Sequence, residues 1–335
     1  AKQHRAQSGM SVFKVTEEDY ARSDLFSRLI ADEETELQPI PRRRGFQKQL
    51  RWAVSALLLL AVFIPSFFGF PSFSLPVKEP ADLASLYSMV DSLPVEEPVL
   101  VVYDVEAGYA AEMEAAASPV LYHLLGRRIH VATLSTDVTG PALAERAIRR
   151  ISLPFVPAVG EDYVHLGYLS GGASGIQLFV SNPSRAGLDG YLRPEGVTAE
   201  GYDAWAAPVL SNVTSLSDFS MAVVVVNDAE RARVWIEQAG PLMEDSFLVM
   251  IVSNGLEPVV RPYFEGRSAE VDAILTGIPA AAAYDMRFQR TGGAAALWNP
   301  YNTAATAMFA VLSSAFILSL YRLIKELKKK AENGS

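Results

Sequence analysis

Three glycines in the stretch "YLSGGASGIQLF" (168–179) are the residues best placed to do chemistry. Gly171, Gly172 and Gly175 stand between a strand-like apolar run and a helix-like one. Such a turn can hold a phosphate on backbone N–H groups at a helix N-terminus. A P-loop, however, needs Lys and Ser or Thr where Ile176 and Gln177 stand, and the spacing is not GxGxxG. The pattern favours a tight turn with close helix–sheet packing, and leaves open an anion or carboxylate held by the helix N-terminus.

Small polar residues also follow the other strand-like runs. Ligands of parallel sheets bind beyond the carboxyl ends of the strands, so a small-solute pocket is expected there. The candidate ligand-binding residues are Asp104, Ser135, Gly171, Gly172, Asn227, Ser253, Asn254 and Gly277. Asp, Asn and Ser are also the ordinary capping residues of strand-to-helix turns, and this structural interpretation stays open beside the functional one.

The sequence offers no assembled catalytic set. It has no cysteine, no GxSxG turn, and no Ser/His/Asp set among the strand ends. The four histidines, at positions 4, 123, 130 and 165, lack metal-ligand spacing. We therefore expect no enzyme activity, no metal and no cofactor. The net charge of −9 argues against nucleic acid as the main partner.

The elements that position these residues alternate between strand and helix. Apolar strand-like runs occupy 99–104, 128–135, 162–169, 221–227, 247–254 and 271–277. This alternation predicts an α/β fold with a mostly parallel, Rossmann-like or flavodoxin-like sheet covered by helices. The order strand–helix–strand–helix–strand–helix occurs twice, which predicts two similar halves at about 95–185 and 215–290. Thr139 and Asp228 are the expected N-caps of two of the helices.

Two uncharged stretches predict membrane spans on either side of this domain. The first is 52–72, within a run from Trp52 to Val77 that holds no charged residue. The second is 299–321, where no charge occurs between Arg290 and Arg322. About twenty apolar residues cross a bilayer core, so both stretches are long enough.

Basic residues flank both spans on the same side, which orients the chain. The tails 1–51 and 322–335 are expected in the cytoplasm of a cell with an inner membrane, and residues 78–290 outside it. That exported segment holds 14 basic and 28 acidic residues, a net of −14. Anionic lipid headgroups are the expected partners of the two flanks. The residues concerned are Arg42, Arg43, Arg44, Lys328, Lys329 and Lys330. Within the first tail, "EEDYARSDLFSRLIADEETEL" predicts either a short amphipathic docking helix or a solvated segment.

Three function classes remain. The first is a non-catalytic membrane subunit whose acidic domain supports assembly of a larger complex, with other integral membrane proteins or a second copy as partner. Ala307, Ala310 and Ser314 would give the second span a small-residue face for close helix packing. The second class is an extracytoplasmic small-solute-binding sensor, and the third is an extracytoplasmic hydrolase.

The layout also resembles a known group of proteins. The apolar runs "VLVVYD" and "MAVVVVN", placed between two spans, are similar to those of exported α/β domains in bacterial ABC-type transport and gliding systems. The domains in question belong to the auxiliary, non-ATPase membrane subunits. This resemblance covers the layout of the domain, carries no site residues, and implies an accessory role.

Overall fold

The computed structural model describes residues 17–36, 52–60, 63, 81–186, 188, 203–243, 246–266, 269–290 and 293–332. The chain divides into two units, Ala1–Leu57 and Leu58–Ser335. In the first unit, α1 (Glu17–Glu36) forms the helix expected in the tail. Its larger apolar side chains, such as Leu25 and Phe26, are exposed, so its docking role stays a prediction.

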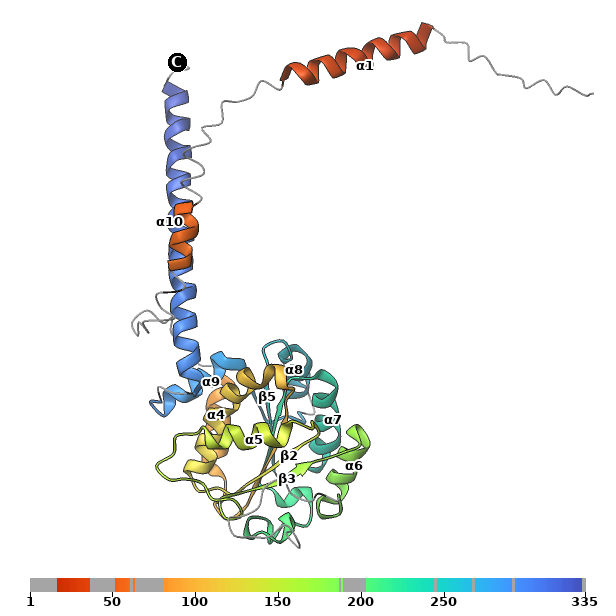
Figure 1. Ribbon diagram of the computed structural model, residues 1–335, viewed down its shortest axis with the longest axis vertical. Helices are drawn as coiled ribbons and strands as arrows, with labels where there is room; N and C mark the ends of the chain where they lie inside the picture. The colour runs from red at the N-terminus through yellow and green to blue at the C-terminus, as the bar shows by residue number, and fades with distance from the viewer. Residues whose placement is uncertain are drawn as a thin grey trace, which may run out of the picture. The chain divides into compact units, whose positions relative to one another are not determined.

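The second unit is built on one parallel sheet of six strands (Figure 1). The strand order is β3-β2-β1-β4-β5-β6, which is the Rossmann order. The predicted parallel α/β fold is therefore confirmed, and each predicted half supplies three neighbouring strands. The strands are β1 (Val99–Asp104), β2 (Val131–Ser135), β3 (Tyr163–Tyr168), β4 (Met221–Val226), β5 (Phe247–Val252) and β6 (Ala273–Thr276).

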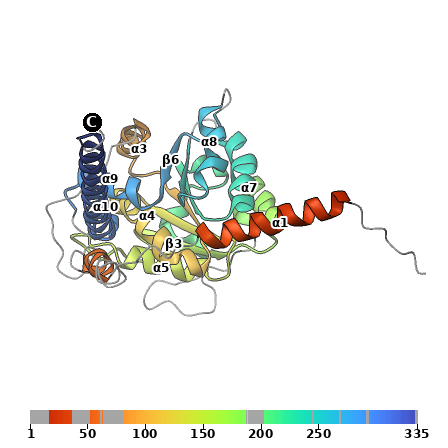
Figure 2. The same ribbon diagram turned by 90° about the horizontal axis from the view of Figure 1, so that it is seen from above.

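Helices cover both faces of the sheet. One face carries α3 (Ala81–Ser92), α4 (Ala110–Gly126), α5 (Gly140–Arg149) and α9 (Gly277–Arg287). The other carries α6 (Gly172–Ser181), α7 (Ala229–Ala239) and α8 (Glu257–Glu265). Figure 2 shows α3 next to α9, and α3 also packs against β6. Short 3₁₀ turns complete the list: η1 (Ala107–Tyr109), η2 (Pro183–Arg185), η3 (Ala204–Ala206), η4 (Pro208–Leu210), η5 (Leu216–Asp218) and η6 (Gly240–Leu242).

The two-sided cover explains why the strands read as unbroken apolar runs. In β1, Val99, Val101 and Tyr103 enter the core under α4 and α5. Leu100 and Val102 enter the other core, under α6 and α7. Because successive side chains point to opposite faces, burial on both faces removes the polar alternation of a half-exposed strand.

Two local expectations meet different outcomes. Asp228 caps α7 as predicted, since its Oδ1 accepts the N–H of Arg231 at 2.9 Å. Thr139 holds the N-cap position of α5, but its side chain makes no capping bond. The Thr139 hydroxyl instead donates to Asp137 Oδ1 at 2.7 Å, a charge-assisted hydrogen bond.

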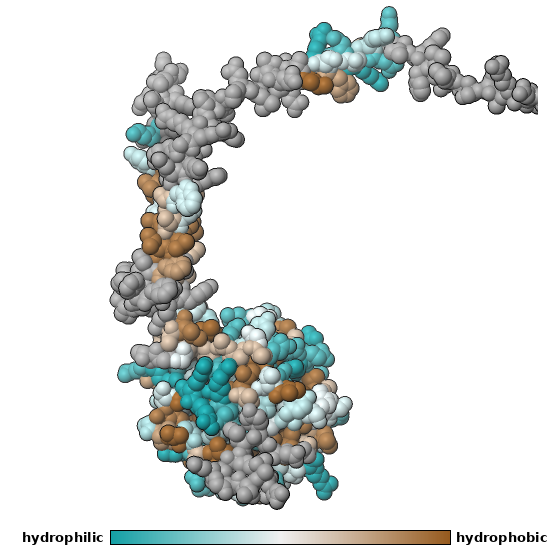
Figure 3. Space-filling view, viewed as in Figure 1, coloured by the Kyte–Doolittle hydropathy of each residue, from teal (hydrophilic) through white to brown (hydrophobic). Residues whose placement is uncertain are grey.

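One helix among the described residues is long and apolar enough to cross a membrane. It is the first part of α10 (Gly293–Glu332), namely Gly293–Tyr321, whose most apolar 18-residue window has a mean hydropathy of 1.8. On this helix Phe309, Phe316 and Ile317 are all exposed. Figure 3 shows apolar side chains gathered along the column that contains α10. The helix begins at Gly293, earlier than the predicted span at 299–321.

The placement of the sheet between two spans is not confirmed. Of the predicted first span, 52–72, residues 52–60 and 63 are helical and the rest lie outside the described residues. The basic positions Arg42, Arg43 and Arg44 lie outside them too. Lys328, Lys329 and Lys330 fall in the last turns of α10.

Candidate functional site

Asp104 and Ser135 come together at the carboxyl edge of β1 and β2, the edge expected from the sequence, and their role in ligand binding stays a prediction. The Asp104 carboxylate accepts hydrogen bonds from Ser135 Oγ at 3.1 Å, Thr136 Oγ1 at 2.7 Å and Trp235 Nε1 at 2.7 Å. The backbone N–H of Thr136 is a fourth donor. Burial raises the pKa of Asp104, and these hydrogen bonds oppose part of the rise.

This cluster joins the two halves of the sheet rather than opening a pocket. Asp104 is completely buried, and Trp235 reaches it from α7 in the other half. Beside it, Asn227 Oδ1 accepts the backbone N–H of Glu106 at 3.0 Å across the division between β1 and β4. A Rossmann fold holds its dinucleotide at this division. Here Asp104 is buried and bonded to Trp235, and Asn227 holds the backbone of Glu106.

The glycines at the same edge serve tight turns. Gly171 and Gly172 have φ of +96° and +55°, as the tight-turn interpretation requires. A Cβ on Gly175 would lie 2.0 Å from the carbonyl oxygen of Ser170, so α6 begins in close contact with the end of β3. The anion-binding interpretation of this turn stays a prediction.

The remaining candidates lie at the far end of the sheet. Ser253 is buried at the end of β5, and a Cβ on Gly277 would lie 2.6 Å from Asn254 Oδ1. β3 and β6 are the two outer strands, separated by five strand spacings or about 24 Å. The eight predicted residues therefore follow one edge of the sheet and do not converge on one ligand.

A buried polar chain in β2, β3 and α5 escaped the sequence analysis. His165 lies between Thr133 Oγ1, in contact with its Nδ1, and Glu145 Oε2, 2.7 Å from its Nε2. Burial raises the pKa of Glu145, but hydrogen bonds from His165, Arg149 and Tyr163 outweigh it and bring the value to about 2.

The order hydroxyl–imidazole–carboxylate is that of a nucleophile, a base and its orienting group. However, Thr133, His165 and Glu145 are 2 %, 0 % and 8 % exposed, so a substrate has no access to the hydroxyl. The chain instead satisfies polar groups inside the core and ties α5 to the sheet. A search restricted to strand ends could not find it, because Thr133 and His165 lie within the strands. The signal was a polar residue inside each apolar run.

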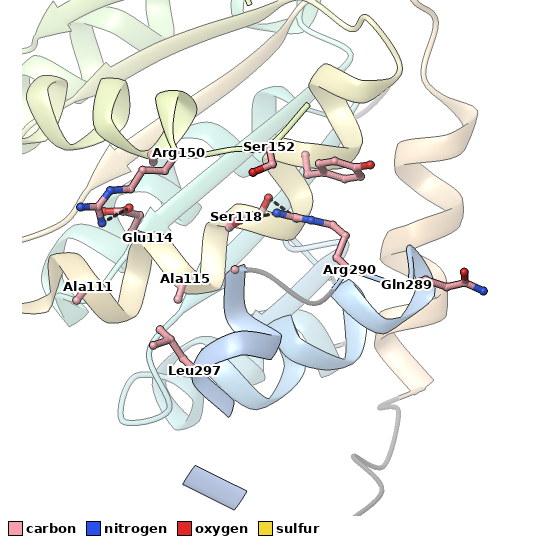
Figure 4. A pocket seen from close by; sticks show the side chains of 12 residues that line it. Ala111, Glu114, Ala115, Ser118, Arg150, Ser152, Gln289, Arg290 and Leu297 are labelled. Atoms are coloured by element: carbon pink, nitrogen blue, oxygen red, sulfur yellow. Dashed lines mark hydrogen bonds and ion pairs between the residues drawn. The ribbon is translucent and has the colours of Figure 1, made fainter. Parts of the chain in front are cut away.

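An open cavity of about 740 Å³ lies elsewhere, between α4, the end of α5 and the link from α9 to α10 (Figure 4). Its volume is in the range of small-molecule sites. Its walls combine charged, hydroxyl and apolar side chains. The residues that carry its character are Ala111, Glu114, Ser118, Arg150, Arg290 and Leu297.

Arg290 organises the side of the cavity next to α10. Its Nη1 lies 2.8 Å from Asp285 Oδ1, its Nη2 is 3.4 Å from Ser118 Oγ, and its guanidinium covers the ring of Tyr122. Asp285 is completely buried, and its Oδ2 accepts the N–H of Ala295 in the first turn of α10 at 3.3 Å. Burial raises the pKa of Asp285, and the charge of Arg290 opposes part of that rise. One ion pair thus joins α4, α9 and α10.

Gly293, the first residue of α10, occupies a position that only glycine fits. Its φ is +60°, and a Cβ would lie 2.9 Å from Asp285 Oδ2 and 3.0 Å from Ser118 Oγ. Any other residue would therefore strain the backbone and push against the ion pair. The start of α10 is packed into the domain rather than attached by a loose linker.

Glu114 and Arg150 form the other charged wall. Glu114 is largely buried and accepts from Arg146 Nε at 2.8 Å and from Arg150 Nη1 at 2.9 Å. The Arg150 side chain is 67 % exposed. In Figure 4, Arg150 points toward Glu114 while Arg290 points toward Ser118. The sequence analysis missed this site because its residues come from α4, from the end of α5 and from the link between α9 and α10, and none of them lies at a strand end.

The predicted helix-packing residues lie further along α10. Ala307 is half-buried, whereas Ala310 and Ser314 are exposed. Ser314 Oγ donates to the carbonyl oxygen of Val311 at 2.7 Å, so its hydroxyl is satisfied within the helix. Their role in packing stays a prediction.

Comparisons with known proteins add no assignment to this geometry. No protein-family model, curated protein or solved structure matches the chain. Within the described ranges, no group of three or more His, Asp or Glu side chains is arranged to hold a metal ion.

Proposed function

We propose that this protein is a non-catalytic, two-span subunit of the cell membrane. Its exported α/β domain supports assembly of, or recognition by, a larger membrane protein complex. The observation that carries the proposal is α10, which begins inside the domain and continues as a long apolar helix. A helix fixed in this way would transmit the orientation of the domain to a membrane partner, and the reverse.

The first turns of α10, from Gly293 onward and here called its foot, support such coupling. Ala294 and Ala295 are 0 % and 2 % exposed, and Asp285 accepts the Ala295 N–H. Beyond these turns, Phe309 and Phe316 are 73 % and 69 % exposed. A contiguous apolar surface of this kind is costly in water, and lipid or neighbouring membrane helices would cover it.

The polar clusters of the domain support a non-catalytic role. Asp104 and His165 are the two groups with the most suggestive chemistry, and both are completely buried. Each is engaged by hydrogen-bonding neighbours, Trp235 and Glu145 among them. A group that acts on a substrate must reach it, so these clusters favour a structural role over a hydrolase.

Topology is the first test. The chain has no cysteine, so single substitutions can be labelled without background. We expect Ser217→Cys, in the exported domain, to react with an impermeant thiol reagent on intact cells. We expect Ser335→Cys, at the cytoplasmic end, to react only after lysis. The reverse pattern contradicts the topology.

Assembly is the second test. Purification of the full chain in a gentle detergent, followed by mass spectrometry, should recover other integral membrane proteins or a second copy in fixed proportion. A chain that migrates alone, in several mild detergents, contradicts the subunit role.

A small-solute sensor is the second candidate, and the cavity favours it. A solute bound between Arg150 and Arg290 would press on the foot of α10. Soluble organic anions should then raise the melting temperature of the detergent-solubilised chain in a saturable way. Arg150→Ala should remove that effect.

A further inference from the structure

We propose that the cavity between α4, α5 and α10 binds the phosphate headgroup of an anionic phospholipid. The lipid would come from the leaflet that faces the exported domain. This inference rests on the proposed membrane function and names a ligand class for the cavity. Three observations carry it: the height of the cavity along α10, the charge of its walls, and the apolar surface beside them.

The height follows from helix geometry. A helix rises about 1.5 Å per residue, so a hydrocarbon core of about 30 Å takes about twenty residues. Counted back from Tyr321, before the basic flank, the core begins near residue 302. Leu297, which lines the cavity, then lies about 7.5 Å beyond the hydrocarbon. Headgroup layers are about 5–8 Å thick, so this wall of the cavity lies at headgroup depth.

The charge of the cluster is opposite to that of its surroundings. Among the lining residues, Arg150 and Arg290 outnumber the one carboxylate, Glu114. Arg146 pairs with Glu114, and Asp285 pairs with Arg290. The exported segment as a whole has a net charge of −14. A local excess of guanidinium in an acidic domain is suited to an anion that the rest of the surface repels.

Arg150 is the side chain best placed to contact the phosphate. It contacts Glu114 through Nη1 alone and is 67 % exposed, so the rest of its planar fork can donate to phosphate oxygens. Arg290 is only 12 % exposed and bonds to Asp285, so it contributes charge and holds Ser118 in the wall.

The apolar side of the cavity fits the glycerol and upper acyl region of a lipid. Leu297 is 52 % exposed on the first turns of α10, and Ala111 is exposed on the facing side of α4. A soluble anion gains nothing from this surface. A lipid has its phosphate beside Arg150 and its apolar part directed along α10 toward the bilayer.

The test uses the full chain in detergent, titrated with phosphatidylglycerol or with phosphatidylcholine, and measures bound lipid by native mass spectrometry. We expect the wild-type chain to hold phosphatidylglycerol in preference to phosphatidylcholine. Arg150→Ala should weaken that binding about tenfold, since it removes a charge-assisted hydrogen bond. Arg149→Ala is the matched control. That neighbour is 71 % exposed and pairs with Glu145, yet it does not line this cavity.

A second variant keeps every charge. Ala111→Phe places a ring at the exposed rim of the cavity, where it would block the opening without changing the packing of the core. It should therefore also abolish the preference for phosphatidylglycerol. If Arg150→Ala fails to fold, which its melting curve will reveal, Ala111→Phe decides alone. Equal binding by wild-type, Arg150→Ala and Ala111→Phe chains overturns the proposal.

Further outcomes distinguish a lipid phosphate from a soluble anion, and failure of the lipid proposal from failure of the proposed membrane function. If inorganic phosphate displaces phosphatidylglycerol at equal concentration, the cavity takes a soluble anion and the lipid assignment is wrong. If the chain fractionates with membranes but shows no lipid preference, this inference fails while the membrane role stands. If it does not fractionate with membranes, the proposed function fails before any titration.

Discussion

Replacing Asp285 with Ala should loosen the foot of α10 and lower the stability of the domain by several kcal/mol. The carboxylate is completely buried and holds both Arg290, at 2.8 Å, and the Ala295 N–H. Removing one partner of a buried ion pair costs about 3–5 kcal/mol, because the other charge is left uncompensated. The lost cap of α10 adds about 1 kcal/mol.

These terms translate into a large shift in melting temperature. A total of about 4–6 kcal/mol in a domain of this size corresponds to a fall of roughly 10–20 °C. The assay is thermal unfolding of the detergent-solubilised full chain, followed by circular dichroism. Because α10 is part of the cooperative unit only while its foot is packed, a broader transition is also expected.

The double variant Asp285→Ala with Arg290→Ala is the control. It removes the orphaned guanidinium, which is only 12 % exposed in the wild-type chain. It should therefore regain part of the lost stability, although it also gives up the stacking on Tyr122. One kcal/mol shifts the melting temperature of a domain of this size by about 2–4 °C. An Asp285→Ala chain that melts within 2 °C of wild type therefore refutes the reasoning. So does a double variant whose loss equals the sum of the two single losses.

Three further predictions concern other parts of the chain. Among three glycine variants, Gly175→Ala should lower the free energy of unfolding most, since its Cβ would lie 2.0 Å from a carbonyl oxygen. Gly172→Ala should lower it by about 1–2 kcal/mol because of the positive φ, and Gly108→Ala, with open space around it, should leave it unchanged. Urea unfolding measures all three. The pKa of Glu145 is depressed from 4.5 to about 2, so its contribution is full above pH 4.5 and is lost as pH falls toward 2; Glu145→Gln should flatten that part of the stability curve. Ala310→Leu should release a membrane partner on blue-native gels while insertion stays intact, and an unchanged complex size removes this face of α10 as the docking surface.

The fold could be predicted from the sequence because its strands are buried on both faces. Six continuous apolar runs, separated by helix-like segments, leave few arrangements other than a parallel sheet. Strand ends were less accurate. The run predicted from 128 begins as a strand only at Val131, because Arg128 has a φ of +63° and turns the chain first. A positive φ at a residue other than glycine leaves little trace in composition.

The candidate residues at strand ends were placed on the correct edge, but their role was not visible in the sequence. Asp104 looks the same in a ligand pocket and in a closed cluster. What decides between them is Trp235, which lies 131 positions away and donates to its carboxylate. Periodicity locates a residue on an element, whereas the partner across the sheet depends on packing between the two halves.

The cavity beside α10 illustrates the same limit and gives the domain its most distinctive feature. Its walls come from Glu114, Arg150 and Arg290, which share no motif and meet because α5 and the start of α10 both pack against α4. That placement depends on Asp285 and on the open backbone of Gly293. The residues that hold α10 in the domain are therefore the ones that shape the cavity. A ligand bound in the cavity and a partner bound to α10 would act on the same ion pair, Asp285–Arg290. Occupancy of the cavity and the orientation of α10 are therefore expected to be coupled.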